Sequence, residues 1–445
     1  MLRRAFPGVY EGWLVVGSAA FTVLLIGASF FYGFGTIFNE VIDEFGWSVA
    51  ATSLAFSLRS EVGGLAAPFV GVLIDRLGAR KVILGGIVIS ACGVFLMSMI
   101  QEIWHFYAVM IVIAFGASAA GGQVGLAAIA TWFEVRRASA MSVMTLGGGL
   151  GGLLVVVIAW LVEQFGWRDA LRMLALVMVT AGIVAGFQIR TRPDDHPQPM
   201  DGRRYYDDVG GEVAPAAKWG IPWRRAIRTR AALFMSLAMI ALSFGTTSVV
   251  VLQIPYLESD LDVSKSVAGA SVMLLTMVSI VGRLGFGILA DRYSKRLMLV
   301  TSSVLVVLGM AVMALADSFP IALLGIILFA PGFGGSIPVR PAMLADYFGT
   351  KYFGTINGLG ALVMTTGGAL GPWLAGVLVD RTGTYESAWW LSAVVTAFAV
   401  PFFLLATPPT TLVAYYRDEA RRDAARAAGA PDSEIGEVHT LLADR

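Results

Sequence analysis

The sequence predicts an all-α membrane protein with twelve transmembrane helices in two pseudo-symmetric six-helix bundles. Three observations predict this fold. The chain of 445 residues is 57% hydrophobic and only 14% charged, whereas soluble proteins carry about 25% charged residues. Apolar runs recur along it, each long enough to cross about 30 Å of hydrocarbon as a helix. Finally, the second half of the chain repeats motifs of the first.

Twelve spans of sufficient length follow one another along the chain. They cover residues 13–38, 49–74, 81–100, 105–130, 138–163, 169–189, 231–256, 267–290, 296–316, 320–345, 353–379 and 385–406. The stretch between the two sets of six is polar and rich in proline, as linkers are. We expect terminal segments at 1–12 and 407–445, bundles at 13–189 and 231–406, and a linker at 190–230. The first apolar run is too long for a cleavable signal peptide.

The distribution of lysine and arginine predicts the orientation. Of the 32 such residues, three lie within spans, four face one side and 25 face the side with both termini and the linker. Because positively charged loops stay in the cytoplasm, we expect the N-terminus, the linker and the tail to be cytoplasmic. The arginine- and alanine-rich composition favours a bacterial inner (plasma) membrane. We expect a monomer to be the functional unit.

Three motifs recur in the same order in the two halves. GVLIDRLGARK (71–81) after the second span is matched by GILADRYSKR (287–296) after the eighth. TWFEVRR (131–137) is echoed by DYFGTKY (346–352), and GGGLGG (147–152) by GGALGP (367–372). The offset of about 215–220 residues indicates duplication of a six-span unit. Parallel repeats of this kind place a substrate path between the halves near the membrane midplane.

The first motif resembles the signature loop of the major facilitator superfamily. The matching positions hold Gly71, Asp75, Arg76, Gly78, Arg80 and Lys81. The second copy departs from the pattern, with Ser294 in place of glycine. Within that superfamily, residues 10–48 and RRASAMSVMTLGGGLGG (136–152) resemble the monocarboxylate transporter and oxalate–formate antiporter group. The resemblance implies a secondary transporter of small organic anions.

The resemblance also implies a gate at the cytoplasmic ends of the spans. Asp75 is expected to pair with basic and helix-terminal groups of the other half when the outside gate is open; the alternative is a tight turn anchored by charges. Gly64, Pro68 and Gly71 precede it at helical spacing, as a stripe of small residues that lets a neighbouring helix approach. The predicted gating residues are Gly71, Asp75, Arg76, Gly78, Arg80, Asp291 and Arg292.

Arg283 lies within the eighth span, eight residues before Asp291 and thus about 12 Å along the helix. An arginine at a helix centre costs at least about 2.5 kcal/mol on insertion scales, so such residues face a cavity or a partner. Members of the group carry an arginine in this span that binds the substrate carboxylate, and Arg283 matches it by position. A guanidinium holds a carboxylate with two parallel hydrogen bonds. The alternative is a structural pair with an intramembrane acid.

Two departures from the group bear on the substrate. Some members place an aspartate one turn before this arginine, where this chain has Ser279. Oxalate exchangers of the group place a lysine in the eleventh span, and residues 354–380 contain none. A doubly charged anion therefore lacks its second cation, which favours a monocarboxylate.

Arg340 is a candidate for the second cation that a doubly charged anion would need. It lies in the tenth span, where residues 330–344 contain three prolines and three glycines. Pro338 and Pro341 each delete a backbone donor, so we expect the helix to kink or break there. The fourth span is loosened in the same way at AAGGQVG (119–125), which contains Gln123. Interrupted segments at corresponding places of two repeats indicate a binding site. Arg340 faces either this substrate path or, by snorkelling toward the cytoplasm, the gate.

Arg59 and Glu61 are two residues apart in the second span, about 200° around the helix, so they face different directions. Glu61 falls on the stripe of small residues and is expected in a helix interface. It is either a structural partner of an arginine or a carrier of the coupling proton. With Glu61 ionised, the three intramembrane arginines and this acid sum to +2, which favours an anionic substrate.

The predicted cavity also needs uncharged hydrogen-bonding groups. The predicted substrate-binding residues are Arg283, Arg340, Gln123, Tyr32, Ser279, Thr246 and Asn357. Neither a metal nor another cofactor is expected, because the single cysteine, Cys92, and the three histidines are scattered. The chain has no G-x-x-x-x-G-K-[ST] loop, which argues against ATP-driven transport.

The sequence therefore predicts a secondary active transporter, not an enzyme. We expect it to move a small organic anion, a monocarboxylate, by alternating access, driven by proton symport or anion exchange. The closest alternative is a proton-coupled exporter of drugs or hydrophobic solutes. From another class, the alternative is a non-transporting membrane sensor or scaffold. The expected partners are the organic anion, protons or a counter-anion, and the lipid bilayer, with no nucleic acid.

Overall fold

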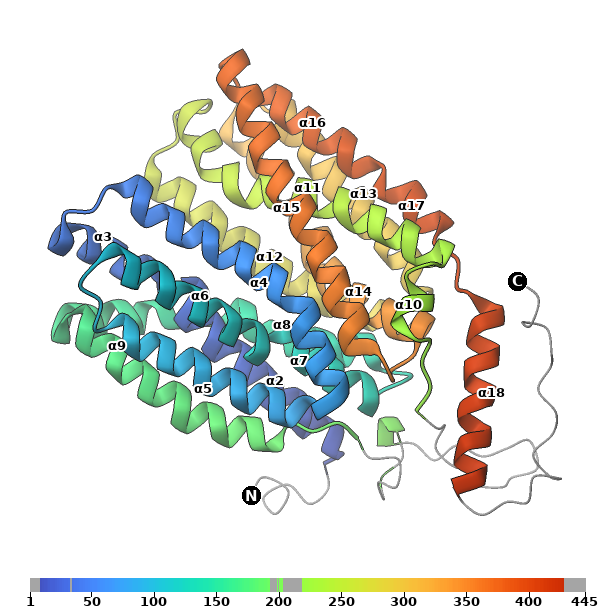
Figure 1. Ribbon diagram of the computed structural model, residues 1–445. Helices are drawn as coiled ribbons and strands as arrows, with labels where there is room; N and C mark the ends of the chain where they lie inside the picture. Colours follow the sequence, from blue (N-terminus) through green and yellow to red (C-terminus); the bar gives the residue numbers. More distant parts are fainter. Residues whose placement is uncertain (1–8, 33, 193–197, 199, 203–217, 428–445) are drawn as a thin grey trace.

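The computed structural model describes residues 9–32, 34–192, 198, 200–202 and 218–427. Within these ranges the chain is almost entirely helical, and long helices lie side by side (Figure 1). One isolated antiparallel bridge, between Gly220 and Gly349, is the single β-type contact of the described residues.

The N-terminal half contains six membrane-length segments, several of them interrupted. The first comprises α2 (Glu11–Ile26), the π-helical turn η1 (Gly27–Tyr32) and α3 (Phe34–Phe45). The next three are α4 (Val49–Leu77), α5 (Ala79–Met97), and α6 (Ile103–Ala120) with α7 (Gly122–Trp132). The last two are formed by α8 (Arg137–Leu150), the 3-10 turn η2 (Gly151–Leu154) and α9 (Val155–Gln188).

The C-terminal half follows the linker, of which η3 (Met200–Gly202) and α10 (Trp223–Ala226) are described. Its helices are α11 (Arg230–Ser259), α12 (Lys265–Arg292), α13 (Lys295–Ala314), α14 (Phe319–Phe348), α15 (Phe353–Thr382), and α16 (Glu386–Ala397) with α17 (Ala399–Leu405). A further helix, α18 (Thr410–Ala427), ends the described chain.

Ten helices are long and apolar enough to cross a membrane, and they account for eleven of the twelve predicted spans. One of the ten, Arg137–Gln188, is 52 residues long and holds two spans, because Gly166 adopts a positive φ of 77° that breaks it. The twelfth span corresponds to α4, a helix of 29 residues. The fold is therefore the predicted all-α arrangement of two six-helix bundles.

The helix interruptions differ in part from those predicted. The fourth span is broken at Gly121, between α6 and α7, as its glycines predict. The tenth span is not broken: α14 runs continuously through Pro331, Pro338 and Pro341. All three prolines lie within a helix that packs closely against α12 and α13. Packing against neighbouring helices compensates for the lost backbone hydrogen bonds in such a setting.

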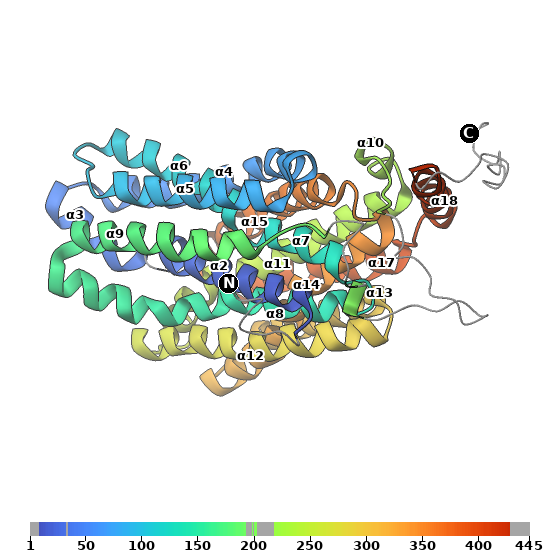
Figure 2. The ribbon, with the colours of Figure 1, turned by 90° about the horizontal axis from the view of Figure 1, so that it is seen from below.

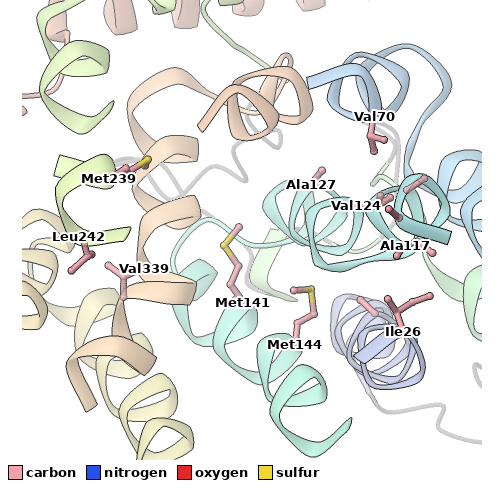
Figure 3. Close-up of a cluster of buried hydrophobic side chains, with 14 of the residues drawn as sticks. Ile26, Val70, Ala117, Val124, Ala127, Met141, Met144, Met239, Leu242 and Val339 are labelled. Carbon is pink, nitrogen blue, oxygen red and sulfur yellow. The ribbon is translucent and has the colours of Figure 1, made fainter. Parts of the chain in front are cut away.

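Buried side chains occupy the interior of each half and the surface between the halves (Figure 3). Large apolar side chains on the outer surface are instead exposed, with Phe69 at 70%, Trp104 at 72% and Val156 at 74%. A soluble monomer rarely exposes apolar patches of this extent. A hydrocarbon surround explains them, and the chain is accordingly an integral, multi-pass membrane protein.

Both views place α10 and α18 at one end of the helix bundle and α3 at the other (Figures 1 and 2). We call the end with α10 and α18 the linker face. The two halves meet through α4 against α15 and through α8 against α12. These pairs are the second and eleventh, and the fifth and eighth, segments of the two repeats.

Candidate substrate cavity and gate

A cavity of about 350 Å³ lies between the two halves. Helices α2, α7 and α8 of the N-terminal half contribute to it, as do α11, α12, α14 and α15 of the C-terminal half. Met144 of α8 and Met239 of α11, both drawn in Figure 3, line it from the two sides. The polar side chains of its lining are Gln123, Thr145, Arg283, Arg340 and Asn357. Four of these five are among the predicted substrate-binding residues.

Arg283 reaches the cavity from α12 and contacts the other half. Its Nη1 donates a hydrogen bond of 2.6 Å to the backbone carbonyl oxygen of Thr145 in α8. A Cβ at Gly149, one turn further along, would lie 3.6 Å from the same nitrogen. The Arg283 guanidinium therefore lies directly beside the glycine-rich segment of α8.

Arg340 also faces the cavity, from α14. Its Nε donates a hydrogen bond of 3.0 Å to the carbonyl oxygen of Ser336, and its Nη1 contacts the sulfur of Met364. Asp346, the acid toward which Arg340 would have to snorkel, instead accepts ion pairs from Arg137 and Lys295. This arrangement favours the substrate path over the gate as the place of Arg340.

Gln123 and Asn357 occupy opposite sides of the cavity, on α7 and α15. The Gln123 amide donates to the carbonyl oxygens of Ala67 at 2.8 Å and of Gly354 in the other half at 3.5 Å. The break at Gly121 positions Gln123 in the cavity wall, because α7 starts at Gly122 and Gln123 is its second residue. An amide in this place can exchange a backbone partner for a substrate oxygen.

Two predicted residues, Ser279 and Thr246, are placed differently. The Ser279 hydroxyl donates to the carbonyl oxygen of Thr276, and its backbone is packed against Gly334 of α14. The Thr246 hydroxyl donates to the carbonyl oxygen of Leu242. Neither residue lines the cavity, and both are buried among the helices of the C-terminal half. Tyr32 ends η1, and its side chain lies outside the described part of the structure.

The charge of the cavity comes from its arginines. No Asp or Glu lines it among the described residues, so its polar groups are two guanidiniums, two amides and a threonine in an otherwise apolar wall. Guanidiniums and amide donors are suited to carboxylates. In the described ranges, no group of three or more His, Cys, Asp or Glu side chains could hold a metal ion.

The predicted gating residues lie at the linker face, where Asp75 belongs to the last turn of α4. Its Oδ1 accepts the backbone N–H of Gly354 at 2.8 Å, and its Oδ2 accepts the N–H of Thr355 at 2.8 Å and the Thr355 hydroxyl at 2.6 Å. These donors belong to the first turn of α15, in the other half. A carboxylate satisfies the N–H groups that a helix start leaves without helical partners.

The second copy of the motif makes the equivalent contact in the opposite direction, from the C-terminal half to the N-terminal half. Asp291 lies 216 residues after Asp75 and ends α12. Its Oδ1 accepts the N–H of Ala138 and its Oδ2 that of Ser139, both at 2.9 Å, at the start of α8. Each half therefore presents one carboxylate to a helix start of the other half.

Small residues allow this contact in both copies. A Cβ at Gly71 would lie 2.2 Å from the carbonyl oxygen of Gly354. A Cβ at the equivalent Gly287 would lie 1.7 Å from the Ser142 hydroxyl oxygen. The predicted stripe of small residues on α4 continues to Gly64, where a Cβ would lie 2.3 Å from the Thr365 hydroxyl oxygen.

The remaining motif residues shape the turns. Gly78, with a φ of 80°, caps both α4 and α5. Its counterpart Ser294 has a φ of −60°, so the second turn has no need of glycine, which explains the departure from the pattern. Arg76 and Arg292 are exposed and Arg80 is half-buried.

Sequence reasoning assigned no role in the gate to Arg137. This buried residue at the start of α8 forms an ion pair with Asp346 at the end of α14, and Lys295 binds the same carboxylate at 2.7 Å. The pair joins the two halves. The repeat of TWFEVRR and DYFGTKY contained the signal, since Arg137 and Asp346 stand at the end of the first motif and the start of the second.

Glu61 is exposed, which corrects the expectation that it lies in a helix interface. The contact of α4 with α15 includes Gly64 and Gly71 on the same stripe, but it leaves the Glu61 side chain uncovered. The side chain of Arg59 lies outside the described set.

A family model described as the Major Facilitator Superfamily matches residues 19–252 and 235–426. The chain belongs to the major facilitator superfamily. The E. coli fucose:proton symporter shares its fold, with a TM-score of 0.67 at 14% identity over 89% of this chain and 98% of that one. These matches confirm the predicted family and fold. Since the family and the relatives below are transporters, the prediction that the chain is not an enzyme is also confirmed.

Several known relatives are named for what they carry. Monocarboxylate transporter 12 of Homo sapiens is 25% identical over 405 residues, covering 85% of this chain and 77% of the relative. Monocarboxylate transporter 13 of Bos taurus is 25% identical over 414 residues, covering 90% and 92%. The fujikurins efflux protein of Gibberella fujikuroi is 28% identical over 229 residues, covering 50% of this chain and 44% of the relative.

Proposed function

We propose that this member of the superfamily moves a small organic anion, a monocarboxylate, by alternating access. The observation that carries the proposal is the joint presence of Arg283 and Arg340 in one cavity between the halves. Two guanidiniums within membrane-spanning helices are costly unless they serve a ligand or a partner. The similarity to monocarboxylate transporters supports the same substrate class.

In this proposal, Arg283 exchanges the Thr145 carbonyl oxygen for the substrate carboxylate. Arg340, Gln123 and Asn357 surround the remaining part of the anion. The described structure, closed at the linker face by Asp75 and Asp291, represents one end state, and rocking of the bundles 13–189 and 231–406 exposes the cavity to the other side. We assign the linker face to the cytoplasm because 25 of the 32 lysines and arginines lie on that side.

Uptake into proteoliposomes tests the proposal. The panel contains labelled lactate, pyruvate, formate, oxalate and a longer carboxylate, each with an imposed pH gradient, with internal anion, or with neither. We expect accumulation of a monocarboxylate that either the gradient or the internal anion drives, which distinguishes symport from exchange. Arg283→Gln should abolish uptake, whereas Arg172→Gln, which removes an arginine near the opposite face, should not. Equal uptake by both variants would contradict the proposal.

A second candidate function is export of hydrophobic solutes. The largely apolar remainder of the cavity wall and the similarity to a fungal efflux protein favour it. Competition by neutral or cationic compounds, unchanged in Arg283→Gln, would favour this second function over anion transport.

A further inference from the structure

The gate carboxylates bind the first turns of α8 and α15, and the linker holds the loop that precedes each of these helices. One loop, residues 133–136, precedes α8, and the other, residues 349–352, precedes α15. Asp291 binds the start of α8 and Asp75 the start of α15, each from the opposite half. The hydrogen bonds of the linker to these loops have no role in the gate described above.

Asp201 holds the first loop. Its Oδ2 accepts the backbone N–H groups of Glu134 at 3.0 Å and Val135 at 2.9 Å, and its Oδ1 accepts that of Arg136 at 3.0 Å. Asp201 is only 7% exposed and has a φ of 57°, a left-handed conformation that aspartate tolerates better than most residues. Three N–H donors on one buried carboxylate fix the path of the loop.

The backbone N–H groups that bind Asp201 and those that bind Asp291 lie next to each other in the sequence. Asp201 takes the N–H groups of residues 134–136 and Asp291 those of residues 138 and 139. One carboxylate comes from the linker and the other from the opposite half. The orientation of the first turn of α8, on which the Asp291 bonds depend, is therefore set by the loop that Asp201 holds.

The linker before Asp201 belongs to the N-terminal half. Arg192 donates its backbone N–H to the Thr131 hydroxyl at 3.0 Å, and the Trp132 indole donates to the carbonyl oxygen of Arg190 at 2.7 Å. Asp201 therefore moves with the half that it holds, whereas the Asp291 bonds must break whenever the linker face opens.

The second loop is held in an analogous way by the end of the linker. The Trp219 carbonyl oxygen accepts the N–H groups of Thr350 at 2.9 Å and Lys351 at 3.1 Å, and Ile221 donates to the Phe348 carbonyl oxygen at 2.9 Å. Gly349 has a φ of 79°, and a Cβ there would lie 2.5 Å from the Trp219 oxygen. The linker thus fixes both loops, the one before α8 through a side chain and the one before α15 through backbone groups.

We propose that Asp201 is a positioning residue of the gate. By fixing the loop at 134–136, it holds the start of α8 ready for Asp291 and so lowers the entropy cost of closing the linker face. The proposal deepens the alternating-access function and rests on it. It predicts that loss of the Asp201 carboxylate opens the linker face by displacing the start of α8, which weakens its contacts with Asp291 and Asp346 of the other half.

A distance measurement between spin labels tests this proposal. Labels are placed at the exposed ends of the two halves through Lys81→Cys and Leu297→Cys, in a Cys92→Ser background. Asp201→Asn should increase the population of the longer distance roughly tenfold, the effect expected for a lost hydrogen bond to a charged group. Asp418→Asn, which changes an exposed aspartate that pairs with Arg422 within α18, should leave the distances unchanged.

A double-mutant comparison separates a role through the gate from a general structural role. In an Asp291→Asn, Arg137→Gln background, which disrupts the contacts of the α8 start with Asp291 and Asp346, Asp201→Asn should cause no further opening. No shift in the parent background, or a shift of equal size in both backgrounds, would overturn the proposal. Asp201→Ser provides a second variant if the asparagine variant unfolds. Because the distances are read without substrate, failure to transport any carboxylate leaves this test intact.

Discussion

At the scale of the residue, the cavity depends on two arginines that reach it from different helices. Arg283 was predictable because it stands as a cation within an apolar run. The environment of Arg340 was not predictable from the sequence. Its place in the cavity or at the gate depended on whether Asp346 was free to pair with it. The structure shows that Arg137 and Lys295 bind Asp346, and those residues lie far from it in sequence.

Substitution of Arg340 should weaken substrate binding without abolishing it. Arg340→Gln removes one of the two guanidiniums and should raise the KM for the transported carboxylate about tenfold, as expected for loss of a hydrogen bond to a charged group. Met364→Leu, at the residue that contacts Arg340, conserves volume and should change KM less than about threefold. Initial uptake rates over a range of substrate concentrations provide both values. An unchanged KM in Arg340→Gln would place this arginine outside the substrate path.

At the scale of the element, helix positions follow from hydropathy, but their continuity does not. The predicted spans agree with the helices to within a few residues at most ends. The break at Gly121 was predictable because glycines there cluster in one segment. The continuity of α14 was not predictable. Packing against neighbouring helices compensates for the backbone hydrogen bonds that its three prolines remove, and the local sequence gives no sign of that packing.

Close helix contact across the gate should make Gly71 intolerant of a side chain. A Cβ there would meet the backbone of Gly354 and Thr355, which no rotamer change relieves. Gly71→Ala should therefore favour the state open at the linker face and lower the uptake rate. Gly85→Ala, at a helical glycine where a Cβ would meet nothing within 4 Å, is the matched control. Equal spin-label distances in the two variants would contradict this account of the contact.

At the scale of the whole molecule, the proposed gate is a pair of equivalent contacts, one from each copy of the repeated motif. The sequence repeat predicted that Asp75 and Asp291 occupy equivalent places. The targets of their carboxylates, the starts of α15 and α8, became visible only in the structure, because backbone N–H groups leave no pattern in the sequence. For the same reason the role of Asp201 was not predictable.

Neutralising either gate aspartate should have the same effect. Asp75→Asn and Asp291→Asn each weaken the bonds to two backbone N–H groups of the other half, so each should increase access to the cavity from the linker face. Modification of Ala361→Cys, in the cavity wall, by a membrane-impermeant maleimide measures this access in a Cys92→Ser background. We expect similar increases of several fold for both variants, and none for Asp418→Asn. An increase for only one aspartate would disprove the equivalence of the two contacts.

The most direct test of the central claim is equilibrium binding of the labelled carboxylate that the uptake panel selects. The purified protein, Arg283→Gln and Arg172→Gln are compared in the same detergent. We predict that Arg172→Gln binds like the parent, and that Arg283→Gln binds at least about tenfold more weakly because a charge-assisted bidentate contact is lost. Binding of equal affinity by Arg283→Gln would show that the anion site lies elsewhere.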